Sequence, residues 1–421
     1  MIESPHPLER QLGMELYMTD TPGMGGVLRK CPEDFLVEEL SAPVDNDGPY
    51  LVCRLTKKNW ELQRLVKEIA RSLGISHRRI SWAGTKDKRA VTTQLIAIYN
   101  IEPEQIRRIN LRDVSLEVVG RSTTPLSLGM LQGNLFSIWI RDCYQEELEA
   151  QVETCVHTSH AGILNYYGIQ RFGARRPVTH QVGERILKGD YEGAILTYVG
   201  RAFPDEPEET RFARQEFWDT RDPKAALRNF PLYLSYERAL LHHLAVAPNE
   251  YREALRTLPP KLLSMFVSAF QSFLFNSALS ARCREEQSLQ QPLEGDLLVF
   301  SDTKTDRVTS PFLPAARIQM DRGRAQLALF IPGSRQVDWR SASHRVQEIL
   351  LEREVTPAHF TAAQDFVGTA FQGFHRPIRL TTDIISQTEG TNVHLRFILL
   401  PGQYATTVCR ECMKTDPLSL V

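Results

Sequence analysis

Apolar and polar positions in the N-terminal part of the chain alternate with periods that distinguish a helix from strands. Between residues 60 and 73 the apolar side chains recur every three or four positions, which predicts a helix with one buried face. Asn59 can cap the start of this helix, and Gly74 can end it. Short strands are expected at 79–83 and 91–99. Asp87 therefore lies in a polar loop between two strands.

A second alternating segment runs from residue 134 to residue 141 and predicts another strand. Asn134 and Phe136 then share one face, because strand side chains repeat every two residues. Helices are expected around 145–161 and near 340–353, with a strand at 393–400. This mixture predicts an α+β fold with a largely antiparallel sheet. A chain of 421 residues is also too long for one ordinary core, so at least two domains are expected.

Charge is unevenly distributed, although the net charge is only −1. Residues 54–90 contain eleven Lys or Arg against three Asp or Glu, whereas residues 201–222 contain seven acidic against four basic residues. Such asymmetry can give one side a positive potential that suits phosphate contacts. An ordinary solvated helix surface explains the same pattern, and charge alone does not decide between them.

The seven cysteines are odd in number and irregularly spaced, which argues against a disulfide framework and for a reducing compartment. Cys409 and Cys412 form a C-x-x-C pair, but no second pair completes a zinc site. His157 and His160 have no carboxylate or thiolate partner nearby in the sequence, so solvated or capping roles are favoured. We therefore expect no metal.

No segment resembles a membrane or export signal. None approaches the roughly 20 consecutive apolar residues of a membrane helix. The N-terminal sequence MIESPHPLERQLGMELY lacks the apolar block of a signal peptide. We expect a cytoplasmic protein without membrane contacts.

The candidate chemistry is a carboxylate among cations, in the run Lys86-Asp87-Lys88-Arg89. Phosphate loops, dinucleotide-binding glycine patterns, nucleophile elbows and H-E-x-x-H motifs do not occur in the sequence. Asp87 could simply cap a turn beside solvated cations. It could instead be an ionised carboxylate aimed at a sugar while the cations hold RNA phosphates. Local spacing leaves both interpretations open.

Six ordered blocks of sequence resemble the TruD family of tRNA pseudouridine synthases. They read A-G-T-K-D-K-R-A-V-T at 83–92, C-P-E-D-F-L-V-E-E at 31–39, L-G at 128–129 with G-N-L-F at 133–136, N-Y-Y-G-I-Q-R-F-G at 165–173, F-Q-S-F-L-F-N at 270–276, and L-P-G…A-T at 400–406. The long strings at 83–92 and 165–173 are specific, so chance agreement in this order is not credible.

The resemblance implies a fold and a set of site residues. The catalytic core would comprise residues 1–174 and 335–421, with a family-specific inserted domain at 175–334. Asp87 matches the catalytic aspartate and Phe136 the aromatic residue that stacks on the flipped base. Asn134 matches an asparagine of the active-site cleft, and Lys86 is expected to contact the substrate. Arg29 occupies the place of a basic residue that pairs with the aspartate. For Arg29, a phosphate contact or plain surface charge remains an equal alternative.

The resemblance also implies tRNA as the partner, with uridine 13 as the first position to test, no cofactor, and a monomer. A longer insertion and the run R-S-T-T-P-L at 121–126 resemble the archaeal and eukaryotic branch rather than the bacterial one. Glycosidic-bond isomerisation could proceed by attack at C1′, by attack at C6, or by removal of the 2′ proton. A non-catalytic RNA-binding protein is the chief rival hypothesis. A nucleoside hydrolase is disfavoured, because it needs clustered aspartates.

Overall fold

The structure is a computed structural model that describes residues 1–41, 44, 47–127, 130–285, 288–335 and 342–421. The chain forms two compact units: unit 1 comprises Met1–Tyr17 and Leu164–Arg379, and unit 2 comprises Met18–Ile163 and Leu380–Val421. The sequence predicted a catalytic core of residues 1–174 and 335–421 with an inserted domain at 175–334, and the two units have other bounds. The inserted domain stays a prediction. The Leu128-Gly129 part of one motif lies outside the described residues.

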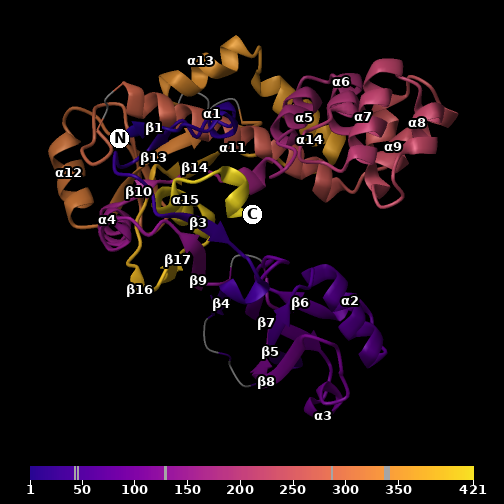
Figure 1. Cartoon of the computed structure of the whole chain (residues 1–421), viewed down its shortest axis with the longest axis horizontal. Helices are drawn as coiled ribbons and strands as arrows, with labels where there is room; N and C mark the ends of the chain where they lie inside the picture. Colours follow the sequence, from indigo (N-terminus) through magenta and orange to yellow (C-terminus); the bar gives the residue numbers. More distant parts are fainter. Residues whose placement is uncertain (42–43, 45–46, 128–129, 286–287, 336–341) are drawn as a thin grey trace. The chain divides into compact units, whose positions relative to one another are not determined.

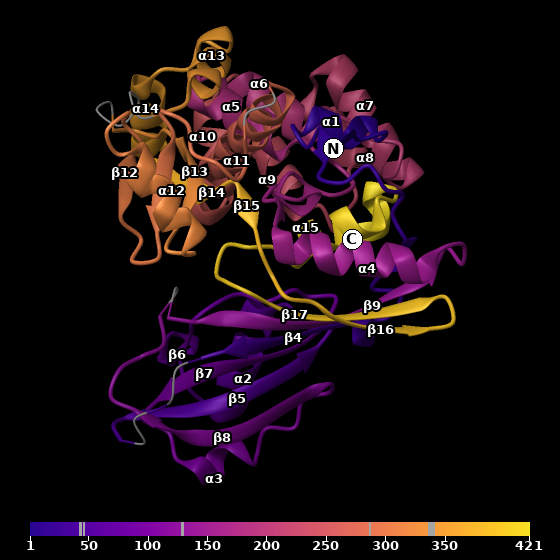
Figure 2. The same cartoon turned by 90° about the vertical axis from the view of Figure 1, so that its left-hand side faces the viewer.

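Unit 2 is built on a large mixed sheet (Figures 1 and 2). Its strands are β3 (Gly25–Leu28), β4 (Phe35–Leu40), β5 (Tyr50–Lys58), β6 (Ile80–Trp82), β7 (Val91–Tyr99), β8 (Val114–Ser122), β9 (Gly133–Cys143), β16 (Ile385–Glu389) and β17 (Asn392–Leu399). The order is β16-β17-β9-β4-β7-β5-β8, with β3 beside β9 and β6 beside β7. Among the described strands, β4 and β7 pair in parallel and the other pairs of this sheet are antiparallel. This confirms the predicted α+β fold with a mostly antiparallel sheet.

Helices cover the two ends of one sheet face in unit 2. They are α2 (Leu62–Leu73), α3 (Pro103–Ile106), α4 (Leu148–Ala161) and α15 (Ala405–Met413), with the short helical turns η1 (Pro32–Asp34), η2 (His77–Arg79) and η6 (Pro417–Leu420). The apolar side of α2 packs on β5, β6 and β7 in one core cluster. Helices α4 and α15 pack on β3, β4, β9 and β17 in a second cluster. Lys57 of β5 and Thr92 of β7, on the same sheet face, belong to neither cluster.

The ends of α2 follow from local backbone chemistry. Gly74 ends the helix in the left-handed conformation, at φ 67°, as predicted. The predicted cap, Asn59, is wrong: Glu61 precedes the helix, and its carboxylate accepts hydrogen bonds from the amides of Gln63 and Arg64. The helix therefore begins two residues later than predicted.

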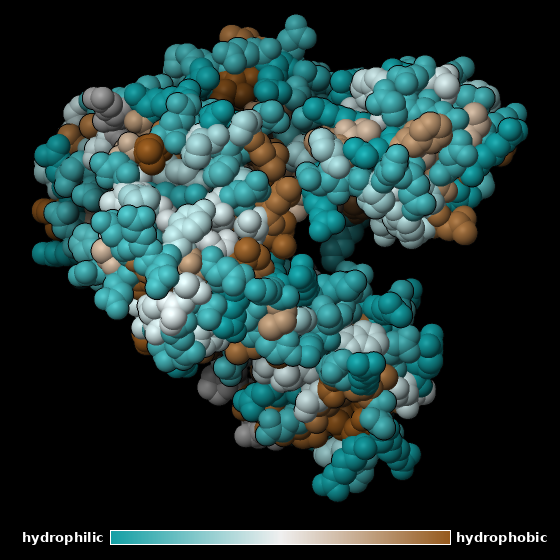
Figure 3. Space-filling model, viewed as in Figure 1, coloured by the Kyte–Doolittle hydropathy of each residue, from teal (hydrophilic) through white to brown (hydrophobic). Residues whose placement is uncertain are grey.

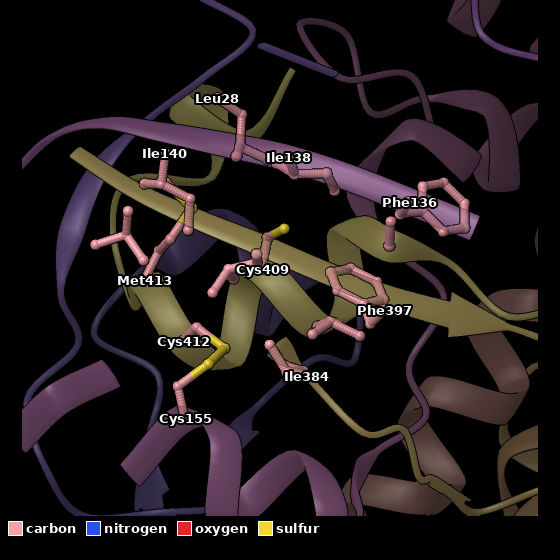
Figure 4. Close-up of a cluster of buried hydrophobic side chains, with 14 of the residues drawn as sticks. Leu28, Phe136, Ile138, Ile140, Cys155, Ile384, Phe397, Cys409, Cys412 and Met413 are labelled. Carbon is pink, nitrogen blue, oxygen red and sulfur yellow. A yellow bond between two sulfur atoms is a disulfide. The ribbon is translucent and has the colours of Figure 1, made fainter. Parts of the chain in front are cut away.

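A disulfide joins Cys155 of α4 to Cys412 of α15, two residues separated by 257 positions in the sequence (Figure 4). The expectation that the irregular cysteines form no disulfide is therefore wrong at this pair. Both cysteines belong to unit 2, but the long loop that the bond closes includes the Leu164–Arg379 part of unit 1. Cys409, one turn earlier on α15, is a free buried thiol, and burial raises its pKa to about 12.

Unit 1 is organised around α11 (Pro260–Arg284). Its other elements are β1 (Ile2–Glu3), α1 (Pro7–Gln11), β2 (Leu16–Tyr17), η3 (Ile169–Arg171), α5 (Thr179–Leu187), α6 (Tyr191–Ile195), η4 (Leu196–Gly200), α7 (Glu208–Thr220), α8 (Pro223–Asn229), α9 (Ser235–Val246), α10 (Tyr251–Leu255), β11 (Leu297–Phe300), β12 (Thr305–Arg307), α12 (Leu313–Asp321), β13 (Ala325–Ile331), α13 (His344–Glu352), α14 (Pro357–Val367) and β14 (Phe374–Pro377). The short strands β10 (Ile163–Leu164) and β15 (Arg379–Leu380) span the boundaries of the two units.

Helix α11 is long and apolar enough to cross a membrane by length and composition, a feature that the sequence reading overlooked. Within its most apolar window 72% is buried inside the protein, as expected of a core helix. Asn276 of α11 donates a hydrogen bond to the carbonyl of Leu12, and Ser280 donates one to the carbonyl of Gly13. These contacts place the N-terminal seventeen residues in unit 1 rather than with the large sheet.

Candidate active site

The centre of the covered sheet face in unit 2 carries buried polar side chains. Strand register places one row across five strands: Lys57 of β5 opposite Thr92 of β7, then Val37 of β4, Phe136 of β9 and Phe397 of β17. Residues that oppose each other in this way share a sheet face. Lys57 and Thr92 are both 0% exposed. The row therefore passes from two buried polar groups, Lys57 and Thr92, into the second apolar cluster, to which Val37, Phe136 and Phe397 belong.

Asp87 lies in the loop between β6 and β7, as predicted. Its side chain is 53% exposed, and its Oδ2 accepts a hydrogen bond of 3.1 Å from Nη2 of Arg29. The Arg29 side chain is only 8% exposed, with its guanidinium 4.0 Å from the ring centroid of Phe35. The structure thus forms the ion pair that the sequence comparison implied for Arg29. The Asp87 carboxylate is therefore about half exposed to solvent and pairs with one buried guanidinium.

The backbone of Arg29 has φ 55°, in the left-handed region that side chains other than glycine rarely adopt. This conformation costs about 1 kcal/mol or more and persists where the surroundings impose it. Here the residue follows β3 and precedes η1. The turn directs the arginine side chain beneath Asp87, over the ring of Phe35.

Three buried side chains fasten the Asp87 loop to the sheet: two bind carbonyls of the loop, and the third belongs to the loop itself. Gln94 of β7 donates a hydrogen bond of 2.9 Å to the carbonyl of Gly84. Lys57 donates one of 2.8 Å to the carbonyl of Asp87 itself. Lys86 is buried and pairs with Oε2 of Glu39 at 2.6 Å. The loop is therefore fastened to the sheet on its inner side, while the carboxylate of Asp87 faces outward.

Of these groups, sequence reasoning identified Lys86 but missed Lys57, Glu39 and Gln94. Lys86 was expected to contact the substrate, whereas its ammonium in the structure is engaged by Glu39 inside the protein. A signal for Lys57 was present in the strand alternation. It occupies the inward position that follows Leu55 on β5, where an apolar residue would ordinarily stand.

Phe136 and Asn134 lie on β9 and share the covered face, as their spacing predicted. The Phe136 ring is stacked on Phe397, with centroids 5.7 Å apart (Figure 4). It also meets the Phe35 ring edge-on, with centroids 6.0 Å apart. Arg29 also contacts Phe35, so contacts run continuously from Asp87 through Arg29 and Phe35 to Phe136. Oδ1 of Asn134 is buried and accepts no hydrogen bond from the described residues.

The 165–173 signature lies in unit 1, where it packs on α11. The hydroxyl of Tyr166 is 2.6 Å from Oγ of Ser280, and the amide of Tyr167 donates to Oδ1 of Asn276 at 2.8 Å. The guanidinium of Arg376 stands 4.0 Å from the ring centroid of Tyr167. Two of the recognisable motifs, 165–173 and 270–276, therefore fit each other. These contacts favour a structural role for this signature.

Basic side chains are exposed on α2 and beside Asp87. Arg64, Lys67, Arg71, Arg78, Lys88 and Arg89 are all exposed. Arg79 differs, because its Nε donates to the carbonyl of Tyr99 at 3.0 Å. The surface over α2 is largely hydrophilic, and apolar residues gather between α2 and α3 (Figure 3). This distribution suits contacts with a polyanion on the α2 side.

Among the described residues, no group of three or more His, Cys, Asp or Glu side chains is placed to hold a metal ion. The chemistry on view is instead that of a half-exposed carboxylate, a buried guanidinium and an aromatic ring. A carboxylate of this kind can act as a nucleophile or as a base.

Comparisons with known proteins agree over nearly the whole chain. The family model of tRNA pseudouridine synthase D (TruD) matches residues 11–412. A "probable tRNA pseudouridine synthase D" of Methanococcoides burtonii is 37% identical, with 98% of each chain covered. Another of that name, from Archaeoglobus fulgidus, is 38% identical over 97% of this chain and 100% of the relative. The crystal structure of a Methanosarcina mazei protein described as a "putative tRNA pseudouridine synthase D (TruD)" has a TM-score of 0.82 at 37% identity, covering 99% of this chain and 100% of that one.

Proposed function

The chain belongs to the TruD family of tRNA pseudouridine synthases, which are isomerases, and from this premise we propose that Asp87 performs the isomerisation. The observation that carries the proposal is the ion pair of Asp87 with the buried Arg29. This pair stands on a loop anchored to the sheet and is linked through Phe35 to Phe136.

The reaction breaks the bond between N1 of uracil and C1′ of ribose, turns the base, and rejoins it through C5. No atom is gained or lost, so the conversion needs no redox cofactor or nucleotide. Asp87 can attack C1′, attack C6, or remove the 2′ proton, and each route requires an ionised carboxylate. Arg29 restricts the rotation of the carboxylate through its hydrogen bond to Oδ2.

We further propose that Phe136 and Asn134 receive the target base. A uridine in folded RNA must leave its stack, at a cost of a few kcal/mol, before any of these routes can begin. The Phe136 ring offers a stacking surface that offsets part of this cost. Oδ1 of Asn134, which has no partner among the described residues, can accept a hydrogen bond from the base.

The exposed basic residues on α2 and beside Asp87 are proposed to hold tRNA phosphates. The segment just before α2 lies near the catalytic loop, because the carbonyls of Trp60 and Asp87 accept hydrogen bonds from the same lysine. Lys86 is assigned a supporting role within the loop in place of a phosphate contact. We also propose that the enzyme works as a monomer in the cytoplasm.

Pseudouridine mapping tests the proposed activity and its position. Purified protein is incubated with unmodified tRNA, and carbodiimide-dependent stops of primer extension are compared with and without enzyme. We expect one new stop at uridine 13 of the D-arm. A stop at a different uridine would correct the position only. Binding of tRNA without any new stop would favour a non-catalytic RNA-binding protein on the same scaffold.

A further inference from the structure

Lys57 is a charged residue at a place where the sheet would ordinarily bury an apolar one. It is 0% exposed, and its ammonium donates two hydrogen bonds of 2.8 Å, one to the carbonyl of Trp60 and one to the carbonyl of Asp87. Trp60 precedes α2, whereas Asp87 belongs to the loop between β6 and β7. One side chain of β5 therefore joins two segments that are distant in sequence.

Burial of this ammonium is unfavourable for folding. The low polarity of its surroundings lowers the pKa of Lys57 to about 8, with Asp87 and Glu61 acting against the shift and Lys86 adding to it. Lys86 is itself paired with Glu39. The two hydrogen bonds of Lys57 offset part of this cost, because they satisfy the carbonyls of Trp60 and Asp87. What an apolar residue could not do at this position is join these two segments.

We propose, resting on the catalytic role of Asp87, that Lys57 is a positioning residue for the isomerisation. By holding the carbonyls of Trp60 and Asp87 together, its ammonium sets the height of the catalytic loop above the sheet. The same ammonium fixes the position of the loop relative to the segment before α2, the helix that carries proposed phosphate contacts. Arg29 orients the carboxylate from its side chain, and Lys57 fixes the main chain from which that carboxylate extends.

This role predicts a loss of catalysis without a matching loss of tRNA binding. Lys57→Met keeps an unbranched side chain, one atom shorter than lysine, and removes the charge and both hydrogen-bond donations. A misplacement of about 1 Å at a reacting group can cost about 100-fold in rate. We therefore expect kcat to fall by about 100-fold, with KM and the Kd for tRNA changing by less than about threefold. The carbonyls of Trp60 and Asp87 lose their donor, which lowers the Tm, whereas removal of a buried charge acts in the opposite direction. The rates are therefore compared at a temperature where both proteins are folded.

The adjacent Lys58 supplies a matched control. It pairs with Glu33 at the surface, and its side chain is 39% exposed. Lys58→Met removes the same group from the next position and should leave kcat within about threefold of the parent, as is usual for surface substitutions. A folded Lys57→Met enzyme with kcat as high as that of Lys58→Met would overturn the proposal.

A pH profile gives a second test. Single-turnover rates of the unsubstituted enzyme should fall as the pH rises through about 8, because a neutral amine is a weaker donor than an ammonium. Lys57→Arg stays charged there, so this alkaline limb should move upward if the variant folds. If no Lys57 variant folds, the unsubstituted enzyme still decides: a rate that stays flat from about pH 7 to 9.5 rejects the proposal.

The fate of Asp87→Asn distinguishes this inference from the proposed function. An inactive Asp87→Asn enzyme together with a fully active Lys57→Met enzyme would reject the positioning role only. An active Asp87→Asn enzyme would remove the catalytic assignment on which both depend.

Discussion

Replacement of Arg29 with methionine separates two roles that its charge could have. The guanidinium is 8% exposed and pairs with Asp87, so the structure favours orientation of the carboxylate over contact with a phosphate. Methionine is unbranched and can keep the contact with the Phe35 ring. It also retains a Cβ, so the cost of the left-handed backbone at φ 55° is the same in both proteins. The substitution thus removes mainly the charge and the hydrogen bond.

The expected magnitudes differ for stability and for catalysis. Asp87 is 53% exposed, so water screens the pair, and its loss should cost about 1 kcal/mol of unfolding free energy or less. No buried carboxylate is left unpaired. In the reaction, however, the freed carboxylate can rotate away from the sugar. Loss of alignment of this kind is expected to lower kcat by about 100-fold, or about 2.7 kcal/mol of activation free energy.

Steady-state kinetics at several salt concentrations distinguishes the two roles. If Arg29 orients Asp87, kcat falls while KM and the salt dependence of tRNA binding are unchanged. If Arg29 binds a phosphate, the slope of log Kd against log salt should become shallower by about 0.9, and KM should rise. Lys30→Met is the control, since Lys30 is 62% exposed and pairs with Asp142. An Arg29→Met enzyme with normal kcat would refute the orientation role.

Three further predictions concern base stacking, phosphate contacts and the disulfide. Phe136→Leu should lower kcat/KM by about 10-fold or more through lost stacking, measured beside Tm to separate a core defect. The affinity for tRNA should fall linearly on a log–log plot against salt, and Arg71→Ala with Arg78→Ala should reduce that slope; an unchanged slope would place the RNA elsewhere. Cys155→Ser should lower the unfolding free energy of oxidised protein by up to about 5 kcal/mol, given the 257-residue separation, and should have a much smaller effect in reductant. Equal effects in both conditions would mean that the bond does not form in solution.

Local pattern predicted the elements that carry the site, because periodicity depends on neighbouring residues alone. The strand at 91–99 was predicted with the bounds that β7 has, and the predicted loop holds Asp87. The start of α2 was missed because residue type favours Asn59 as a cap, whereas the structure uses Glu61, a less common capping residue. The backbone decides between them: Asn59 takes φ 61°, and the chain turns once more before the helix begins.

The supporting residues of the site depend on register and on contacts between distant segments. Gln94 and Lys57 come together with the catalytic loop only when β5 pairs with β7 in one particular register. No local pattern indicates that register. The Cys155–Cys412 bond is equally invisible, because irregular spacing does not reveal which helices are adjacent. Resemblance supplied Asp87, Arg29 and Phe136, whereas the structure was needed to find what holds them.

Tritium release from tRNA labelled at C5 of uracil tests the catalytic role of Asp87 most directly. Asp87→Asn is nearly isosteric, leaves the loop anchors in place, and removes the nucleophile or base on which every proposed route depends. We expect release to disappear, while tRNA binding and Tm, measured on the same preparations, stay near the parent values. Release at a rate close to that of the parent would show that Asp87 is a structural cap and that the chemistry lies elsewhere.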